Sequence, residues 1–446
     1  MFWMMASIIA GTLGLAAFAA AAGEDPTDFS PRPEEQQLPK KMHSAMKVQP
    51  TIKVGREDAD IVGNDNRALQ AAVDYIAGLG GGIVEIGPGE YLMKDSLHMR
   101  SNVTIRGTVG KTILRKAPSA VSALGIDGDY GEEQFTVVNP AGFEVGAGVA
   151  VWDNQSGGFH TVVGRITGRT GNTFALDHSM LSDYLVANEA KAATVFPVVS
   201  GCEIENGHLE DLIIDGNKIN NVPLNGCRGA GIYLYRGFGV TIERCVARNF
   251  NGDGISFQQS NDVVVQDALA EDNAGLGLHP GSGSQRPVVR RCTARRNSED
   301  GLFLCWRVRH GLFENNTLEN NGRFGISIGH KDSDNLLRAN KVVSNGQDGI
   351  FFRNEALGMA GHRNRLEENI IENNGKQSDA AGIRVRGETQ DLILRNNTIR
   401  DTRPQAQRHQ VMGVCLEEQA GPATLENNTI EAQVPVKDLR KVAGSK

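Results

Sequence analysis

The sequence of 446 residues predicts an all-β fold, a right-handed parallel β-helix of about ten coils, from three observations. A glycine followed by an aliphatic residue recurs at steps of 23 or 24 residues, which lengthen to 33 and 31 near the end. An asparagine flanked by aliphatic residues recurs about midway between these glycines. No helical period separates the two series, so each repeat holds two or three short strands that pair in parallel with the next coil. Chirality favours the right-handed form.

Two columns of residues define the repeat. The glycine series is Gly231, Gly254, Gly277, Gly301, Gly325, Gly349, Gly382 and Gly413. The asparagine series are Asn316, Asn340, Asn369, Asn397 and Asn428, and Asn297, Asn321, Asn345 and Asn374. One amide per coil suits a ladder in which each side chain bonds its neighbours above and below. The Asn-x-Thr runs at 315–317, 396–398 and 427–429 also match glycosylation acceptors, but the ladder explains them better.

The N-terminal segment is an export signal in this interpretation. Residues 1–22 are apolar and end in small residues, as a signal peptide does, and residues 23–50 read as a polar linker. No Lys or Arg precedes the apolar run, so an uncleaved anchor is the alternative. We expect a monomer that is secreted or periplasmic, with no membrane span after signal cleavage.

The remaining chain divides into four expected parts. Residues 51–130 hold a capping helix and the first coils, because Leu69, Ala72, Val73 and Ile76 share one helical face within 64–78 and an open solenoid end needs a cap. Residues 131–198 alternate apolar and polar residues, as a small inserted β module would. Residues 199–433 form the main β-helix, and residues 434–446 form a tail.

The net charge gives no support for nucleic-acid binding, and the cysteine positions argue against a disulfide between Cys245 and Cys292. A net charge of −7 gives no reason to expect nucleic acid as a partner. Cys245 and Cys292 occupy equivalent repeat positions two coils apart, roughly 9–10 Å, which is beyond the reach of a disulfide. We expect them to be buried small apolar residues.

Strand alternation sorts the side chains that follow each repeat glycine. The first and third positions are apolar and must face the core, for example Ile326 and Ile328. The second and fourth positions then face outward. Just past the strands come further polar and aromatic side chains. The outward candidates are His279, Trp306, Arg307, His330, Lys331, Arg353 and Glu355, with Tyr233, Tyr235, Phe303, Phe351, Asn354 and Arg384.

These outward residues predict a functional groove. Coils lie about 4.8 Å apart, so side chains from four coils form one patch. Exposed Phe303, Phe351, Tyr233 and Trp306 would serve as flat platforms for sugar rings. The cations suit an anionic polysaccharide.

One part of the chain resembles a known family. Residues 51–115, with "NRALQAAVDYIAGLGGGIVEIGPGEYLMKDSLHMRSNVTIRG", resemble the opening of pectate-lyase-superfamily β-helix proteins, and "HLEDLIIDGNK" (208–218) extends the resemblance to about residue 430. The resemblance implies the fold, whereas the superfamily hosts lyases, hydrolases, epimerases and inert adhesins. The clustered aspartates of polygalacturonase-like hydrolases are missing. Of the Asp-Pro-His-Asp of alginate epimerases, "LHPGSGS" (278–284) keeps a His-Pro pair.

Lyases of that superfamily cleave uronate chains by β-elimination, which needs three roles. Arg307, Arg353 and Asn354 are the candidates to neutralise the sugar carboxylate. Lys331 or His330 is the candidate base, because nearby positive charge disfavours their protonated forms. The group that protonates the leaving oxygen is His279, or whichever member of that pair is not the base.

Two other functions stay open. A glycoside hydrolase needs two carboxylates, for which Glu355 with Asp332 or Asp300 is available. A non-catalytic glycan-binding or surface β-helix is the third reading. No cofactor is required, but Asp332 and Asp334 in "DSD" are candidate calcium ligands, the alternative to a polar turn.

Overall fold

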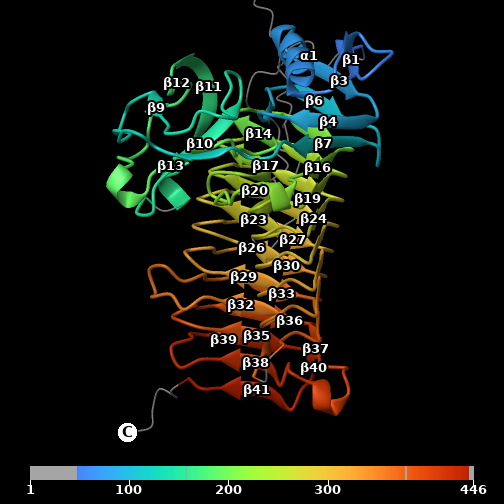
Figure 1. Ribbon diagram of the computed structural model, residues 1–446. Helices are drawn as coiled ribbons and strands as arrows, with labels where there is room; N and C mark the ends of the chain where they lie inside the picture. The colour runs from blue at the N-terminus through green and yellow to red at the C-terminus, as the bar shows by residue number, and fades with distance from the viewer. Residues whose placement is uncertain (1–47, 157, 377–378, 441–446) are drawn as a thin grey trace, which may run out of the picture.

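The computed structural model describes residues 48–156, 158–376 and 379–440, and it confirms the predicted parallel β-helix (Figure 1). Three long sheets run along the molecule, and every strand in them pairs in parallel with its equivalents in neighbouring coils. The predicted signal peptide, 1–22, and all but the last residues of the predicted linker, 23–50, lie outside the described residues.

The strands of the three sheets stack in register from the N-terminal to the C-terminal end. Sheet I contains β5 (Leu97–His98), β14 (Val199–Cys202), β17 (Ala230–Tyr235), β20 (Asp253–Gln258), β23 (Leu278–Gly281), β26 (Leu302–Phe303), β29 (Ile326–Ile328), β32 (Ile350–Phe352), β35 (Ala381–Val385), β38 (Met412–Leu416) and β41 (Val434–Asp438). Sheet II contains β2 (Ile61–Val62), β1 (Thr51–Gly55), β3 (Gly82–Ile86), β6 (Val103–Arg106), β15 (His208–Glu210), β18 (Thr241–Glu243), β21 (Val264–Gln266), β24 (Val288–Arg290), β27 (Leu312–Glu314), β30 (Leu336–Arg338), β33 (Arg365–Glu367), β36 (Leu392–Arg395) and β39 (Ala423–Glu426). Sheet III contains β4 (Gly89–Met93), β7 (Thr112–Lys116), β16 (Ile213–Asp215), β19 (Val246–Arg248), β22 (Leu269–Glu271), β25 (Thr293–Arg295), β28 (Thr317–Glu319), β31 (Lys341–Val343), β34 (Ile370–Glu372), β37 (Thr398–Arg400) and β40 (Thr429–Glu431).

The N-terminal end of the column is capped as predicted. Helix α1 (Asn66–Gly78) begins after Asp65, whose side chain accepts a hydrogen bond from the Arg67 backbone N–H. The predicted face of α1 is completely buried against the first coils, with Leu69, Ala72, Val73 and Ile76 in the core. In the described ranges, short 3₁₀ helices lie in loops at Gly158–His160, Val186–Asn188, Lys218–Asn220 and Gln405–Gln407.

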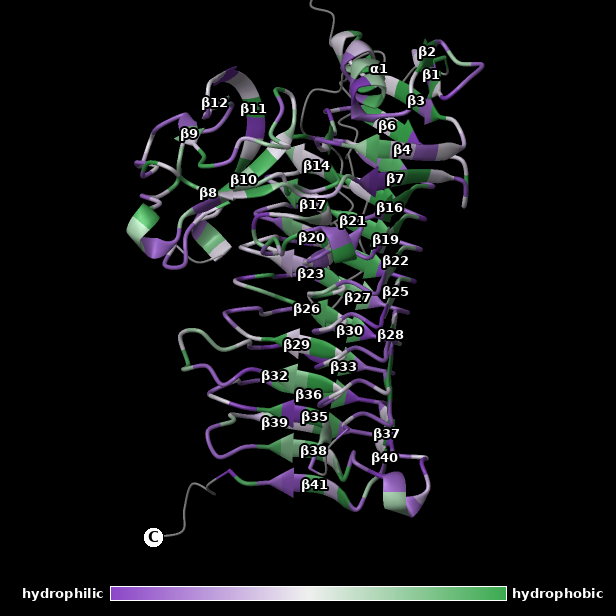
Figure 2. Cartoon of the chain, viewed as in Figure 1, coloured by the Kyte–Doolittle hydropathy of each residue, from purple (hydrophilic) through white to green (hydrophobic). Residues whose placement is uncertain are grey.

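The interior follows the strand alternation, with apolar residues along the axis of the column (Figure 2). The predicted inward residues, such as Ile326 and Ile328, are fully buried. Both predicted asparagine ladders are present. In one of them the Nδ2 of Asn321 donates to Asn345 Oδ1 at 3.0 Å, and the Oδ1 of Asn321 accepts from Asn297 Nδ2 at 3.0 Å. A further pair, Asn335 and Asn364, makes the same contact.

An inserted β module leaves the column between β7 and β14 and lies beside its first coils (Figure 1). Its antiparallel sheet runs β8 (Val121–Ala123), β13 (Lys191–Ala193), β10 (Gly148–Trp152), β11 (Val162–Thr170), β12 (Thr173–Leu176) and β9 (Gln134–Thr136). This sheet begins before residue 131, because the short β8 pairs with the distant β13. The segment expected as a tail, 434–446, starts with β41, which adds a final strand to sheet I.

The described residues show the state of the cysteines and whether any helix could span a membrane. All six cysteines are free, and Cys245 and Cys292 are buried, as predicted. Within residues 48–156, 158–376 and 379–440, no helix has the length and apolarity that a bilayer crossing requires.

The asparagine ladder generates a stability prediction. Asn321→Leu removes the hydrogen bonds that the Asn321 side chain accepts from Asn297 N and Nδ2 and donates to Asn345 Oδ1 and Ala294 O, and it leaves the buried Asn297 N–H without an acceptor. We expect it to lower the free energy of unfolding by about 3 kcal/mol or more, because each unpaired buried group costs about 1–3 kcal/mol. Urea unfolding followed by circular dichroism measures the loss. Lys341→Leu, at an exposed position in the next coil, is the control, and equal stabilities of the two variants would contradict the ladder's role.

A buried lysine, Lys116, contacts both segments that connect the inserted module to the column. Lys116 Nζ donates to Ala117 O at 3.0 Å and to Thr194 O at 2.8 Å, where the chain leaves the column and returns. The ammonium also lies 4.1 Å from the centroid of the Phe196 ring. Burial lowers the pKa of Lys116 from its ordinary 10.5 to about 7.

This lysine generates a pH prediction. Between pH 7 and 10.5 the unfolded chain binds a proton that the folded protein does not, so the stability contributed at Lys116 rises with pH across that window. Below pH 7 the full penalty for burying the charge applies. We expect Lys116→Met to stabilise the protein by about 1–3 kcal/mol at pH 6, and this gain to shrink towards pH 10. Thermal unfolding at a series of pH values measures the difference, and a gain independent of pH would rule the explanation out.

Candidate functional site

The outer face of sheet I, from β23 to β35, brings together most of the predicted site residues. The strands present one outward side chain each, and the turn that follows each strand adds more. From β26 to β32 and their turns, the face carries Phe303, Trp306, Arg307, His330, Lys331, Arg353, Asn354 and Glu355. We call this set the site face. Its parallel register keeps neighbouring side chains about 4.8 Å apart.

His330 and Glu355 form the centre of the site face. His330 Nε2 lies 2.8 Å from Glu355 Oε1, and the two side chains are 27% and 20% exposed. Burial lowers the pKa of His330, and Arg353 lowers it further, whereas Glu355 opposes the shift. The imidazole is therefore uncharged at neutral pH. The other ring nitrogen, Nδ1, is buried and has no hydrogen-bond partner.

The turns that carry these groups contain non-glycine residues in the left-handed backbone conformation, which costs free energy. Trp306 and Arg307 have φ values of 62° and 67°, and His330 and Lys331 have 48° and 68°. Two consecutive non-glycine residues in this region cost free energy, and such conformations cluster at functional sites. Stacking holds the turns, since Arg307 N donates to His330 O at 2.9 Å and the Trp306 ring lies 5.3 Å from that of His330.

Asp332 fastens the His330–Lys331 turn from inside. Its completely buried carboxylate accepts hydrogen bonds from Val308 N at 2.9 Å, Gly329 N at 3.1 Å and Arg353 Nη2 at 3.0 Å. Burial raises the pKa of this carboxyl, and Arg353 opposes the rise. Asp332 is therefore a positioning residue for the turn.

The calcium hypothesis for Asp332 and Asp334 finds no support in the geometry. Arg353 engages Asp332, whereas Arg363 binds both oxygens of Asp334 at 2.6 and 2.8 Å. Among the described residues, the one group of His and carboxylate atoms close enough to share an ion is His208, Glu210 and Glu243, on the outer side of sheet II. Arg106 and Arg244 already pair with Glu210.

Arg353 is a clamp across the site face. Its Nη1 donates to Ser327 Oγ at 2.9 Å, and its Nη2 donates to Leu304 O at 2.7 Å. The guanidinium lies 4.4 Å from the centroid of the Phe303 ring. Arg353 is thus committed to holding Phe303 and Asp332, which leaves the role of neutralising a sugar carboxylate to other groups.

Two predicted outward residues are buried, which corrects the expectation that they are exposed. Tyr233 is 8% exposed and His279 is 3% exposed. The reason is the loop 224–229, which covers them and whose path no sequence pattern indicated. His279 Nδ1 lies 2.7 Å from Asp253 Oδ2, so Asp253 is more than the turn residue it resembles in the repeat.

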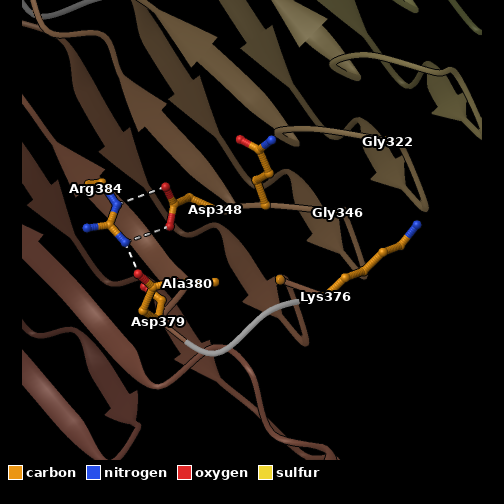
Figure 3. A pocket seen from close by; sticks show the side chains of 9 residues that line it. Gly322, Gly346, Asp348, Lys376, Asp379, Ala380 and Arg384 are labelled. Carbon is orange, nitrogen blue, oxygen red and sulfur yellow. Dashed lines mark hydrogen bonds and ion pairs between the residues drawn. The ribbon is translucent and has the colours of Figure 1, made fainter.

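The remaining predicted residues lie around the edges. Trp306 is 39% exposed, and Phe351 stacks on Phe324 with centroids 4.1 Å apart. The Tyr235 ring is covered by Arg236, whose guanidinium carbon lies 4.9 Å from the ring centroid. Arg384 is paired with Asp348 at 2.9 Å and lines a cavity of about 410 Å³ at the other edge of sheet I (Figure 3).

The glycoside hydrolase hypothesis required Glu355 and a second accessible carboxylate, either Asp332 or Asp300. Asp332 and Asp300 are both fully buried, and burial raises the pKa of Asp300 to about 6. Glu355 therefore has neither of these as an accessible partner. Cys305, which the alternation placed outward, is buried as well, and burial raises the pKa of its thiol.

Sequence reasoning missed several contributors. Ser256 and Ser327 are buried small polar residues at outward positions, and their alternation was visible without indicating a role. The clamp from Arg353 to Asp332 joins residues from successive coils, which repeat alignment could have suggested through the opposite charges.

Comparisons with known proteins agree with this architecture. A family model described as "Periplasmic copper-binding protein (NosD)" matches residues 210–401. Mannuronan C5-epimerase AlgE1 of Azotobacter vinelandii is 24% identical over 305 residues, which are 66% of this chain and 15% of that protein. The chain thus spans a small part of that relative's length.

Solved structures show the same fold. The AlgE4 A-module of the Azotobacter vinelandii mannuronan C-5 epimerase has a TM-score of 0.55 at 15% identity, covering 87% of this chain and 100% of that one. A structure named "Glycoside hydrolase" has a TM-score of 0.52 at 11% identity, covering 86% of this chain and 97% of that one. The chain is a right-handed parallel β-helix protein, as its repeats and its resemblance predicted.

Proposed function

We propose that the protein acts on a uronate-containing polysaccharide at the site face, by removing the proton next to the sugar carboxylate. One observation carries the proposal. Arg307 and Lys331 lie in the two stacked turns that also carry Trp306 and His330, and neither cation has an ion-pair partner in the part of the chain that the structure describes, whereas most other arginines there are paired. Unpaired cations beside an uncharged imidazole suit a substrate with a carboxylate and an acidic C–H bond.

Each residue then has a chemical role. Arg307 binds the sugar carboxylate and stabilises the negative charge that develops when the proton leaves. His330 accepts the proton on its imidazole, and Glu355, whose Oε1 lies 2.8 Å from Nε2, stabilises the imidazolium that forms. Trp306, which is 39% exposed, supplies a platform for a sugar ring. Lys331, the other member of the predicted pair, donates a proton to the leaving oxygen, because His279 is buried behind the loop 224–229.

The same first step serves two outcomes. In β-elimination, the electron pair from the broken C–H bond forms a double bond as the leaving oxygen departs with the proton from Lys331. In epimerisation, a proton returns from the opposite face of the ring. Similarity to mannuronan C5-epimerases supports uronate chemistry in general, and we favour elimination because a second cation stands beside the base.

The location of the protein also remains a proposal. An apolar N-terminal segment and a matching family described as periplasmic support a secreted or periplasmic location.

The described residues do not fit the copper ion of that description. The His208, Glu210 and Glu243 group has one imidazole, no thiolate or thioether, and a carboxylate already held by Arg106 and Arg244. No step is assigned to copper.

The first prediction of this proposal concerns products. With a panel of uronate polysaccharides, with and without calcium, we expect ultraviolet absorbance from unsaturated uronates. His330→Gln should lower the rate by about 100-fold or more, the usual contribution of a general base. Arg291→Ala, an exposed ion-paired arginine near sheet II, is the matched control and should leave the rate unchanged.

Parallel reactions in heavy water separate the alternatives. Deuterium incorporated beside the carboxylate without new absorbance would mean epimerisation. New reducing ends without absorbance or deuterium would mean hydrolysis and would reject proton abstraction.

The second prediction concerns pH. The pKa of His330 lies below its ordinary 6.5, and the base must be uncharged, so kcat/KM should fall only as the pH drops through that lower value. Glu355 raises the pKa of His330, so Glu355→Gln should move this acid limb to still lower pH. A limb that stays in place or moves upward would show that His330 is not the titrating base.

A further inference from the structure

The outer face of sheet I changes from covered to open along the molecule. Over β17, β20 and β23 the outward Tyr233, Ser256 and His279 are buried. From β26 onward the outward Phe303 and Phe351 are partly exposed and Trp306 is exposed, whereas Ser327 on β29 is buried beneath the side chain of Arg353 and not by the loop 224–229. One end of the site face is therefore closed and the other end is open.

The loop 224–229 forms the closure. Ser256 Oγ donates to Gly226 O at 2.6 Å, and Tyr233 OH donates to Cys227 O at 2.8 Å. A Cβ atom added at Gly226 would overlap the Asp253 carboxylate, so the backbone is seated directly on the Asp253–His279 pair. At its start, Leu224 is buried and its backbone N–H donates to Asn251 O at 2.9 Å.

The inserted module contacts the loop 224–229. Arg228 Nε donates to Phe159 O at 2.5 Å, and the side chain of Asn225 packs against Gly158. The module is fixed to the column by Arg165 Nε, which donates to Asp95 Oδ2 at 2.7 Å. The loop is thus fixed on both sides.

We infer that the site face is a groove with one blind end, so that the protein takes the end of a polysaccharide chain and releases short products. This inference rests on the proposed function. The blind end lies above β26, and Phe303 on β26 is one coil from the strand that precedes His330, about 4.8 Å. That spacing leaves room for about one sugar ring between the wall and the base.

Binding of end-labelled probes tests the inference without turnover. The probes are an unlabelled uronate hexasaccharide, the same sugar with a bulky fluorophore at its reducing end, and the same sugar with a bulky group at its non-reducing end. The protein is the full chain with His330→Gln. We expect one label to weaken binding at least tenfold, because that end must enter the blind end, and the other label to have no effect.

A loop variant identifies the wall. Tyr233→Phe, Ser256→Ala and Arg228→Ala together remove three hydrogen bonds that hold the loop, and we expect the discrimination between labels to fall below threefold. Arg236→Ala, an exposed arginine paired with Glu203, is the control and should keep it.

The outcomes separate the two proposals. If both labels are tolerated equally, the groove runs through and the inference is wrong, while uronate recognition stands. If the unlabelled hexasaccharide does not bind, the proposed function fails and the inference fails with it. Discrimination that survives in the loop variant would place the wall elsewhere and overturn the assignment to 224–229.

Discussion

The spacing between coils is the constraint on which the rest of this structure depends. Parallel pairing fixes equivalent residues about 4.8 Å apart, and buried asparagines lock that register by donating and accepting along the column. A one-residue slip would turn every inward side chain outward, so the ladder and the alternation enforce each other. Because the register is rigid, side chains far apart in sequence meet at predictable heights on the outer face.

The fold followed from the sequence because repetition makes local signals add up. A single Gly-Ile pair is weak, but eight in register determine strand direction, core side and coil height together. The cap was readable for the same reason, since Leu69, Ala72, Val73 and Ile76 obey one period. The insert was harder to delimit, because its edge strand β8 is three residues long and pairs with a strand that lies about seventy residues later.

The site followed only in part, because burial on an outer face depends on loops that have no period. Alternation correctly turned His279 and Tyr233 away from the core, yet the loop 224–229 covers both. Arg353 was an obvious cation, but its commitment to Asp332 and Phe303 is a matter of packing. By contrast, His330 and Glu355 meet because both follow strand ends one coil apart, which the register alone dictates.

The contacts of Lys116 have a consequence for how such a molecule diversifies. One ammonium reaches the carbonyls at both chain crossings of the module, so the points where the chain departs and returns are only a few ångströms apart. The module also has its own aromatic core around Phe135, Phe143 and Phe174. A segment with adjacent ends and an independent core can be exchanged for another with little loop-closure entropy and no change in the stacking beneath it. The column and the inserted module are in this sense separable parts, so the module that contacts the loop 224–229 can change while the stacked coils keep their shape.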